Sequence, residues 1–249
     1  RIQYIFDVFD IYSAKTDLSM DSESITVILE ELLNLTEGLL QDKEGKRKTC
    51  NCCEEKVYYT RLSDFYCGER IKDNVKEHIP ETLNKEEYLC PCCMASDRDR
   101  LIVAFLKQLG LEDVIDGEKF LQIAPSPAIE HWINANCPGI VYHSTDLFLD
   151  HVTFKSDVQN MSMIEDESYD YFVCSHVLEH VEDDKRAMRE LHRILKKDGM
   201  GIFLEPIYLD IENIDEEWEL PEEENWKRLG QGNYCRSYAK QELIERLEE

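Results

Sequence analysis

Hydrophobic and polar residues follow three different patterns along the chain. In residues 21–42 apolar positions recur at helical spacing, which predicts an N-terminal helix of about five turns. Residues 43–95 show little periodicity. A second amphipathic helix is expected between Ser96, which suits the N-cap, and Gly110, which suits the C-terminal stop. Its apolar side consists of Leu101, Ile102, Phe105, Leu106 and Leu109.

From about residue 118 short apolar runs alternate with helical patterns. The expected strands are 119–123, 139–144, 169–175 and 199–206, and the expected helices are 128–136 and 183–197. Such alternation predicts parallel strands joined by right-handed crossovers. We therefore expect an α/β fold with a Rossmann-like, doubly wound, mostly parallel sheet. The expected domains are a helical segment (1–45), a cysteine-rich module with a linking helix (46–110) and the sheet domain (111–249).

The composition limits the partners and the compartment. The chain has 28 basic and 53 acidic residues, a net charge of −25, and no long run of Lys or Arg. It should be repelled by nucleic acid and by anionic lipid, so we expect neither partner. No apolar stretch reaches the roughly 18 residues of a membrane helix, and residues 1–10 do not form a signal peptide. These features predict a cytoplasmic protein with reduced cysteines. A start at Arg1 is compatible with a fragment, as is an incomplete C-terminal end.

Two Cys-x-x-Cys pairs predict a metal site. Their residues are Cys50, Cys53, Cys90 and Cys93. Each pair can grip one ion from a tight turn, and two pairs complete a four-sulfur zinc site. Such a site is saturated by protein ligands, so the zinc would be structural. Cys67 and His78 lie between the pairs as substitute ligands, and a redox dithiol or unliganded thiols are the alternatives.

Polar residues at the expected strand ends suggest a nucleoside site, because ligands of open parallel sheets bind at the carboxyl ends of the strands. Asp146 could accept both hydroxyls of a ribose. Asp157 could accept from an adenine amino group, and the next backbone amide could face a ring nitrogen. Taken singly, each Asp more often caps a helix or a turn. The residues expected around the ligand are Ala124, Pro125, Ser126, Asp146, Leu147, Asp157, Val158 and Ser175.

The stretch SYDYFVCSHVLEHVEDDKRAMRELHRILKKDGMGIFLEPI resembles the later motifs of class I S-adenosylmethionine-dependent methyltransferases. Three further segments resemble one bacterial branch of that family: CPCCMASDRDR after the second cysteine pair, the glycine-free loop QIAPS, and GQGNYCRSYA near the C-terminus. The resemblance runs from about residue 118 to the C-terminus. It implies that residues 111–249 bind S-adenosylmethionine and transfer its methyl group to an acceptor, perhaps a small molecule or a glycan.

The resemblance also suggests roles for single residues. The candidate general bases are His176, His180 and Tyr234, although His180 is as well explained by packing. The candidate acceptor-binding residues are Gln231, Arg236 and Tyr238. Pro125 and Pro127 remove amide donors from the loop, so Arg98 and Arg100 could hold the cofactor carboxylate, or could be exposed at the start of a helix.

Three alternatives remain beside this prediction. A methyltransferase-like module could bind a partner without turnover. HVLEH also fits the metallopeptidase pattern H-x-x-E-H, but His176 directly follows a strand, so the two histidines would not share a helix face. A nicotinamide dehydrogenase could use the same sheet, but no Tyr-x-x-x-Lys occurs.

Overall fold

The computed structural model describes residues 47–62, 78–229 and 232–249. The N-terminal helix predicted over 21–42 and the candidate Gln231 lie outside these residues, as does Cys67. The contacts divide the chain into two compact units. We call residues 47–62, 83–111 and 126–136 the cysteine-rich unit, and residues 78–82, 112–125, 137–229 and 232–249 the sheet unit. The domain bounds expected from the sequence stay predictions.

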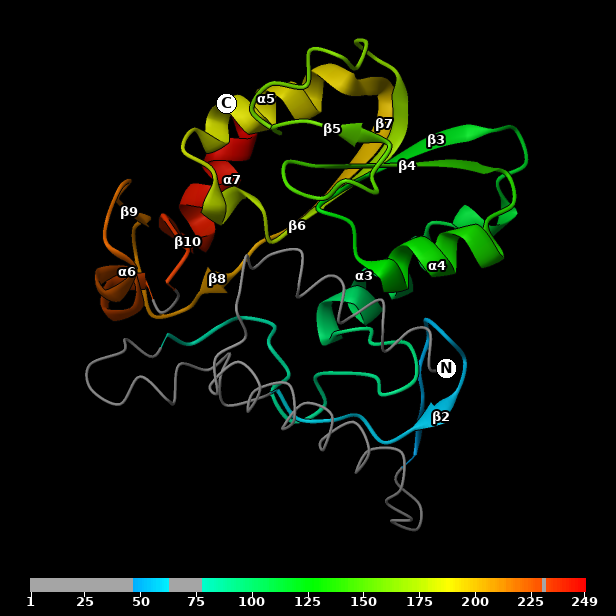
Figure 1. Ribbon diagram of the computed structural model, residues 1–249, viewed down its shortest axis with the longest axis horizontal. Coiled ribbons are helices and arrows are strands. Elements are labelled where there is room, and N and C mark those ends of the chain that lie inside the picture. The colour runs from blue at the N-terminus through cyan, green and yellow to red at the C-terminus, as the bar shows by residue number, and fades with distance from the viewer. Residues whose placement is uncertain (1–46, 63–77, 230–231) are drawn as a thin grey trace. The chain divides into compact units, whose positions relative to one another are not determined.

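The cysteine-rich unit combines a short hairpin with two helices (Figure 1). Its elements are β1 (Lys48–Thr49), β2 (Lys56–Val57), α3 (Asp97–Gln108) and α4 (Pro127–Asn136). The strands pair antiparallel, and α3 packs against α4. The fully buried side chains of this unit include Ile102, Val103, Leu106, Ile129, Trp132 and Ile133.

The helix predicted after Ser96 is confirmed, but its buried side is shifted. The Ser96 hydroxyl accepts from the Asp99 amide, and the Asp99 carboxylate accepts from the Ser96 amide, which forms a capping box. Leu101 and Phe105 were expected on the apolar side, but they are 48% and 41% exposed. Ile102 and Leu106 are buried as expected, and Val103 and the capping residue Asp99 are buried beside them.

A five-stranded parallel sheet forms the centre of the sheet unit, in the order β5-β4-β3-β6-β7 (Figure 1). Its strands are β3 (Glu118–Ile123), β4 (Ile140–Asp146), β5 (Phe154–Lys155), β6 (Tyr169–Ser175) and β7 (Leu195–Leu204). The chain first builds outward from β3 to β5 and then crosses to the other side of β3. This order defines a Rossmann-like, doubly wound fold with its switch point between β3 and β6.

The core of the sheet unit explains the helical patterns. α5 (Asp184–Ile194) and α7 (Lys240–Glu248) pack against each other. The buried cluster joins both helices to the sheet through Leu121, Ile123, Met161, Phe172, Cys174, Leu191, Ile194, Tyr238 and Leu243. α5 ends three residues before its expected end at Lys197, because Leu195 adopts an extended conformation and pairs with Tyr169 in the sheet.

A second, three-stranded sheet near the C-terminus was not expected from the sequence. It consists of β8 (Ile207–Tyr208), β9 (Asp215–Glu216) and β10 (Arg236–Ala239), in the order β8-β10-β9. The helix α6 (Glu222–Leu229) follows β9. All four residues of β10 are buried, so this strand anchors the C-terminal region to the core.

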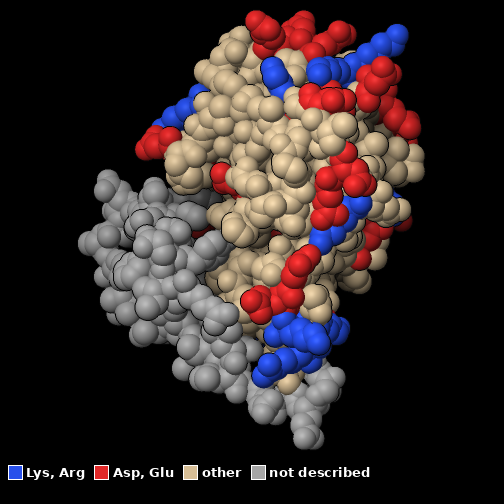
Figure 2. Space-filling model, turned by 90° about the vertical axis from the view of Figure 1, so that its right-hand side faces the viewer, with Lys and Arg blue, Asp and Glu red and all other residues tan. Residues whose placement is uncertain are grey.

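The acidic character of the chain is spread over its surface. Figure 2 shows acidic side chains over the described part of one face, with basic side chains beside many of them. Among the described residues, for example, Arg193 pairs with Asp166, and Lys196 with Asp170. Exposed pairs of this kind contribute little to stability, about 0–1 kcal/mol each, so the fold depends on the buried core.

Candidate functional site

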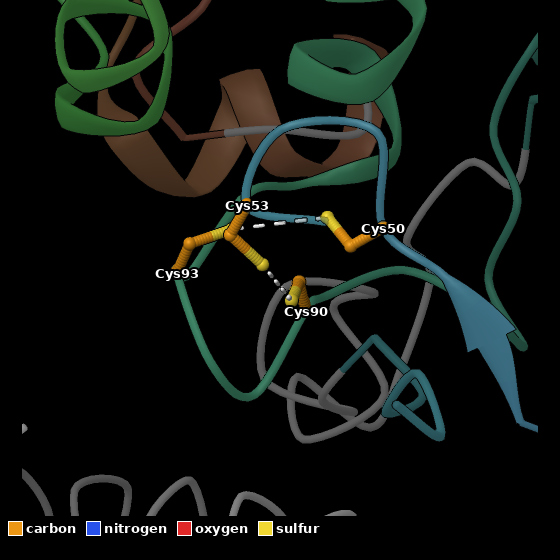
Figure 3. Close-up of side chains that lie close together, drawn as sticks. All are labelled: Cys50, Cys53, Cys90 and Cys93. Atoms are coloured by element: carbon orange, nitrogen blue, oxygen red, sulfur yellow. Dashed lines mark hydrogen bonds between the residues drawn. The ribbon is translucent and has the colours of Figure 1, made fainter. Parts of the chain in front are cut away.

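Four cysteine side chains converge in the cysteine-rich unit (Figure 3). They are Cys50, Cys53, Cys90 and Cys93, and their sulfur atoms all lie within 4.8 Å of one another. The Cys50 and Cys93 sulfurs are 3.8 Å apart, and those of Cys53 and Cys90 are 3.9 Å apart. Four thiolates around a zinc ion with bonds of about 2.3 Å would be about 3.8 Å apart at the corners of a tetrahedron. The spacing of the four sulfurs therefore fits such an ion.

Both cysteine pairs are built on the same backbone turn. In the first, the Cys50 amide donates to the Glu55 carbonyl, and the Glu54 amide donates to the Cys50 carbonyl. The second repeats this pattern at the corresponding positions Cys90, Met94 and Ala95. Glu54 and Met94 both have positive φ, at 63° and 59°. This left-handed residue closes each turn, so that the two sulfurs of a pair face the same point.

The four thiols of the cluster influence each other. Among the described residues no cysteine forms a disulfide. Hydrogen bonds from the Cys52, Cys90 and Cys93 thiols lower the pKa of Cys50, whereas hydrogen bonding to Cys50 raises the pKa of Cys93. One thiol of the cluster therefore ionises readily, which is the state in which sulfur binds a metal.

Arg100 is part of the framework that holds the two turns. Its guanidinium donates to the carbonyls of Tyr88 (2.8 Å), Ala95 (3.1 Å) and Glu87, and it lies 3.9 Å from the centre of the Tyr59 ring. These contacts engage Arg100 within the cysteine-rich unit, and the role suggested for Arg98 or Arg100 at the cofactor carboxylate stays a prediction.

The substitute ligand His78 lies elsewhere. Its ring stacks on Tyr208 with 4.4 Å between the ring centres, and its Nδ1 lies 2.9 Å from Asp210. It therefore belongs to the sheet unit, and the described cysteine cluster consists of the two Cys-x-x-Cys pairs alone.

The switch point of the sheet is marked by two strained residues. Ala124 follows β3 with φ 50°, and His176 follows β6 with φ 53°. The register of β3 and β6 pairs Ile123 with Cys174, so Ala124 and Ser175 continue neighbouring strands at the same edge. The Ser175 hydroxyl is buried and has no hydrogen-bond partner among the described residues. Strained backbone and an unpaired buried hydroxyl at a switch point are typical of a ligand site.

Asp146 ends the neighbouring strand β4. One of its carboxylate oxygens, Oδ1, accepts from the amides of Phe148 (2.7 Å) and Leu149 (2.9 Å). No described residue donates to the other oxygen. Asp146 therefore shapes its own loop with one oxygen, while its second oxygen has no donor among the described residues.

The other expected cofactor residues occupy varied positions. The Asp157 carboxylate accepts from the amide and the side chain of Gln159, which closes a turn. Val158 is 5% exposed within the core, whereas Leu147 is 49% exposed beside Asp146. The Ser126 carbonyl accepts from the Glu130 amide at the start of α4, and Pro125 directly precedes it in the loop.

Two buried carboxyl groups lie at the ends of β6 and β7. Glu179 belongs to the turn η2 (Leu178–His180) and is 0% exposed, and Glu205 directly follows β7 and is 8% exposed. Burial and then the charge of Glu179 raise the pKa of Glu205 well above its ordinary value. Burial alone would also raise the pKa of Glu179, but His176, Glu205 and His180 outweigh it and lower that pKa. The surroundings of Glu205 therefore oppose its ionisation, whereas those of Glu179 favour ionisation.

We expect the melting temperature of the Glu205→Gln variant to depend less on pH than that of the native protein. Because the folded pKa of Glu205 is raised, its contribution to stability is complete below the unfolded pKa of about 4.3 and is lost as pH rises toward the folded pKa. The melting temperature of the native protein should therefore fall more steeply than that of Glu205→Gln as the pH rises above about 4.3. Thermal melts followed by circular dichroism test this, with the exposed Glu212→Gln as control. Parallel curves for native protein and Glu205→Gln would contradict it.

The two candidate histidines flank Glu179. His176 Nδ1 lies 3.3 Å and His180 Nε2 lies 3.8 Å from the Glu179 Oε1 atom. His180 Nδ1 lies 2.9 Å from the Asn233 carbonyl, and its ring meets the Tyr234 ring edge-on with 5.1 Å between the centres. His180 and Tyr234 both line a hollow of about 410 Å³. The structure thus brings these three candidates together around one buried carboxylate.

Arg236 and Tyr238, expected to bind an acceptor, are buried in β10. Arg236 is 3% exposed, and its guanidinium donates to the carbonyls of Leu178, Val181 and Glu182. Tyr238 is 0% exposed, and its hydroxyl donates to the Asp184 carboxylate at 2.8 Å. Arg236 therefore holds the turn that carries Glu179 and His180, and both residues position the site from below its surface.

Residues 134–203 match a family model described as a methyltransferase domain. This segment covers less than half of the chain, and it contains Asp146, Asp157, Ser175, His176 and Glu179. The match supports the methyltransferase class that the motifs indicate. No curated protein matches the chain.

Solved structures resemble the chain only distantly. The YcgJ protein from Bacillus subtilis is 17% identical, with a TM-score of 0.38, over 57% of this chain and 66% of that one. Phosphoethanolamine N-methyltransferase 2 of Haemonchus contortus, in complex with S-adenosyl-L-methionine, is 16% identical, with a TM-score of 0.41, over 59% and 35%. The (4+2)-cyclase SpnF is 15% identical, with a TM-score of 0.44, over 74% and 67%. The chain thus spans less than two thirds of the length of YcgJ and of the phosphoethanolamine N-methyltransferase. The fold assignment rests on the strand order of this chain.

Membrane spanning was tested on the described helices as well. None of the helices in the described residues combines the length and the apolar character that a membrane span needs.

Proposed function

We propose that this chain is an S-adenosylmethionine-dependent methyltransferase. The observation that supports this most is the convergence of Ala124, Asp146 and Ser175 at the switch point of a 3-2-1-4-5 type parallel sheet. The methyltransferase-domain match includes two of these three residues, Asp146 and Ser175. Each of these three residues has a feature that the fold alone does not require: a strained backbone, an unpaired carboxylate oxygen or an unpaired hydroxyl.

The residues fit the cofactor as follows. The free oxygen of Asp146 would accept from the ribose hydroxyls, and Asp157 and the amide of Val158 would hold the adenine. The unpaired Ser175 hydroxyl and the exposed Ala124 lie where the methionine part would pass. When bound, the cofactor supplies an electrophilic methyl group on a sulfonium. The chain then has to hold the acceptor in line with that methyl, which is the main catalytic effect in such a displacement.

Proton removal falls to the histidines beside Glu179. A hydroxyl or ammonium acceptor must lose its proton, and a carboxylate beside an imidazole stabilises the imidazolium that results. His176 and His180 are both within 4 Å of the Glu179 carboxylate. We assign the acceptor to the class of small molecules, and Tyr234 lies beside His180 at the same hollow.

We also propose that Cys50, Cys53, Cys90 and Cys93 bind one structural zinc ion. Their sulfur spacing supports it, and four protein ligands leave no position for a substrate. This zinc would stabilise the cysteine-rich unit and take no part in the methyl transfer.

Calorimetric titration with S-adenosylmethionine tests the proposed function. Asp146→Ala should weaken binding by about 1.5–3 kcal/mol, roughly 10- to 150-fold, because it removes a charge-assisted hydrogen bond to the ribose. Asp146→Asn keeps an oxygen for the Phe148 and Leu149 amides, so any loss in this variant reports the ligand and not the loop.

The matched control is Asp150→Ala, because Asp150 is an acidic residue that follows Asp146 and pairs with Lys155. It should bind like the native protein. If the native protein does not bind S-adenosylmethionine, or if Asp146→Ala binds as tightly as Asp150→Ala, the proposed cofactor site is wrong.

A further inference from the structure

The hollow beside His180 is built from the C-terminal part of the sheet unit. Its volume is about 410 Å³, large enough for a small organic molecule. It is lined by His180, Glu217, Trp218, Glu219, Asn225, Asn233, Tyr234 and Cys235. These residues come from η2, from the segment between β9 and α6, from α6 itself, and from the segment before β10. The described lining contains two acidic side chains and no Lys or Arg.

The walls of this hollow offer negative charge and aromatic faces. Glu217 pairs with Arg228 at 3.0 Å, so part of its charge is compensated. No described basic side chain pairs with Glu219, which adopts a positive φ of 69°. Trp218 is 46% exposed, and Tyr234 lies against His180. Carboxylates beside indole and phenol rings attract cations through both charge and the ring quadrupole.

Asn225 adds an unpaired hydrogen-bond acceptor. It is 9% exposed, and its Nδ2 donates to the Gly232 carbonyl at 3.0 Å, which fixes the orientation of the amide. Its Oδ1 is buried and has no donor among the described residues. Buried acceptors are normally satisfied, so a donor from a bound molecule fits this atom. An ammonium or hydroxyl group would supply it, whereas a phosphate or carboxylate would not.

His180 presents its other ring nitrogen as a base. Because Nδ1 faces the Asn233 carbonyl, which can only accept, Nδ1 carries a hydrogen. Nε2 is therefore the nitrogen with a lone pair that can accept a proton, and it lies 3.8 Å from the buried Glu179 carboxylate. The charged groups that face this ring are Glu179 and the acids of the hollow.

We propose that the hollow binds an organic ammonium ion and that an amine is the methyl acceptor of this site. The second part rests on the proposed function. A primary ammonium R–NH₃⁺ gives one proton to His180 Nε2 and becomes R–NH₂. The nitrogen lone pair then forms the C–N bond as the C–S bond breaks, and the electron pair of that bond stays on sulfur. The products are a methylammonium ion, a neutral thioether and protonated His180, which returns its proton to solvent.

Direct binding to the native chain tests this without requiring turnover. The probes are propylammonium and choline, with 1-propanol and 3,3-dimethylbutan-1-ol as uncharged molecules of matched shape. Binding is followed by ligand-observed NMR and calorimetry. Each cation should bind at least about tenfold more tightly than its uncharged match, since charge and cation–π contacts are lost in the latter. Trp218→Leu and Glu219→Gln should each weaken the binding of both cations several-fold.

Asn225→Leu separates hydrogen bonding from charge. It should weaken propylammonium, which has N–H donors, more than choline, whose ammonium nitrogen has none. The matched controls are Trp226→Leu and Glu223→Gln, which change the same residue types on α6 outside the lining. They should leave both affinities unchanged.

The possible outcomes distinguish the two proposals. The ammonium site is overturned if the cations and their uncharged matches bind equally well. It is also overturned if neither cation binds detectably at millimolar concentration in about 50-fold excess over the protein. The ammonium site is likewise overturned if the lining variants and the control variants lose the same amount of cation affinity. Binding of the cations by a chain that does not bind S-adenosylmethionine leaves the ammonium site in place and refutes the proposed methyl transfer.

Discussion

Removing zinc should unfold the cysteine-rich unit while the sheet unit keeps its secondary structure. Each strand in this unit has only two residues, and its two turns are closed by residues with positive φ. Structural zinc contributes an apparent binding energy of roughly 10–16 kcal/mol in small peptides, comparable with the entire stability of a typical domain. We therefore expect the zinc-loaded chain to show a thermal transition of its own for the cysteine-rich unit. A strong chelator, or the Cys90→Ser substitution, should abolish that transition.

Elemental analysis of the purified protein should show about one zinc per chain, because two Cys-x-x-Cys pairs complete one tetrahedral site. Cys92→Ser is the matched control, since Cys92 lies inside the same turn but outside the four-sulfur cluster. It should keep the metal and the melting profile. A metal-free chain that melts like the zinc-loaded chain would show that the cysteines hold no structural ion.

The parallel, doubly wound sheet could be predicted from the sequence because its strands alternate with helical patterns. Residues 120–123 of β3, for example, are all buried, and such a run has few alternatives to an inner strand. The end of α5 could not be predicted, because Leu195 continues the apolar spacing of Leu191 and Ile194. The small C-terminal sheet has strands of two to four residues, too short to show any period.

The cysteine turns could be predicted because their chemistry is local: each pair of ligands lies within four residues. The pairing of Glu179 with Glu205 could not, because it joins residues 26 positions apart through the sheet register. A partial signal did exist, since Glu205 directly follows an apolar strand and Glu179 lies four residues after another. Arg236 shows the opposite limit. It matches a motif and carries a positive charge, but the sequence does not reveal that its donors are turned inward to backbone carbonyls.

The same limit applies to the glycine-free loop after β3. The Ala124 amide donates to the Thr145 carbonyl at 2.9 Å, and Pro125 and Pro127 have no amide hydrogen. Only the amides of Ser126 and Ala128 remain in this loop for an anionic ligand. Arg100 donates to the carbonyls of Tyr88 and Ala95 in the cysteine-rich unit, so the loop and this arginine both have few donors to spare. The loop therefore contributes shape more than hydrogen bonds.

Ala124→Leu should accordingly abolish cofactor binding and leave the fold intact. Ala124 is exposed at the switch point with φ 50°, and the left-handed conformation costs a residue with a Cβ about 1–2 kcal/mol, which alanine already bears. The larger side chain adds bulk where the methionine part of the cofactor would pass. We expect at least roughly a 100-fold loss of affinity, about 2.7 kcal/mol, in calorimetric titrations with S-adenosylmethionine. Circular dichroism should be unchanged.

Ala124→Gly is the matched control for backbone strain. Glycine adopts positive φ freely, so this variant should bind the cofactor like the native protein and gain up to about 1 kcal/mol of stability, reduced by the greater entropy of its unfolded chain. If Ala124→Leu and Ala124→Gly both bind like the native protein, the loop does not face the cofactor. If only Ala124→Leu loses binding while both variants melt cooperatively, the steric effect at the switch point is established, and the small residue in this loop serves the role that glycine has in glycine-rich nucleotide loops.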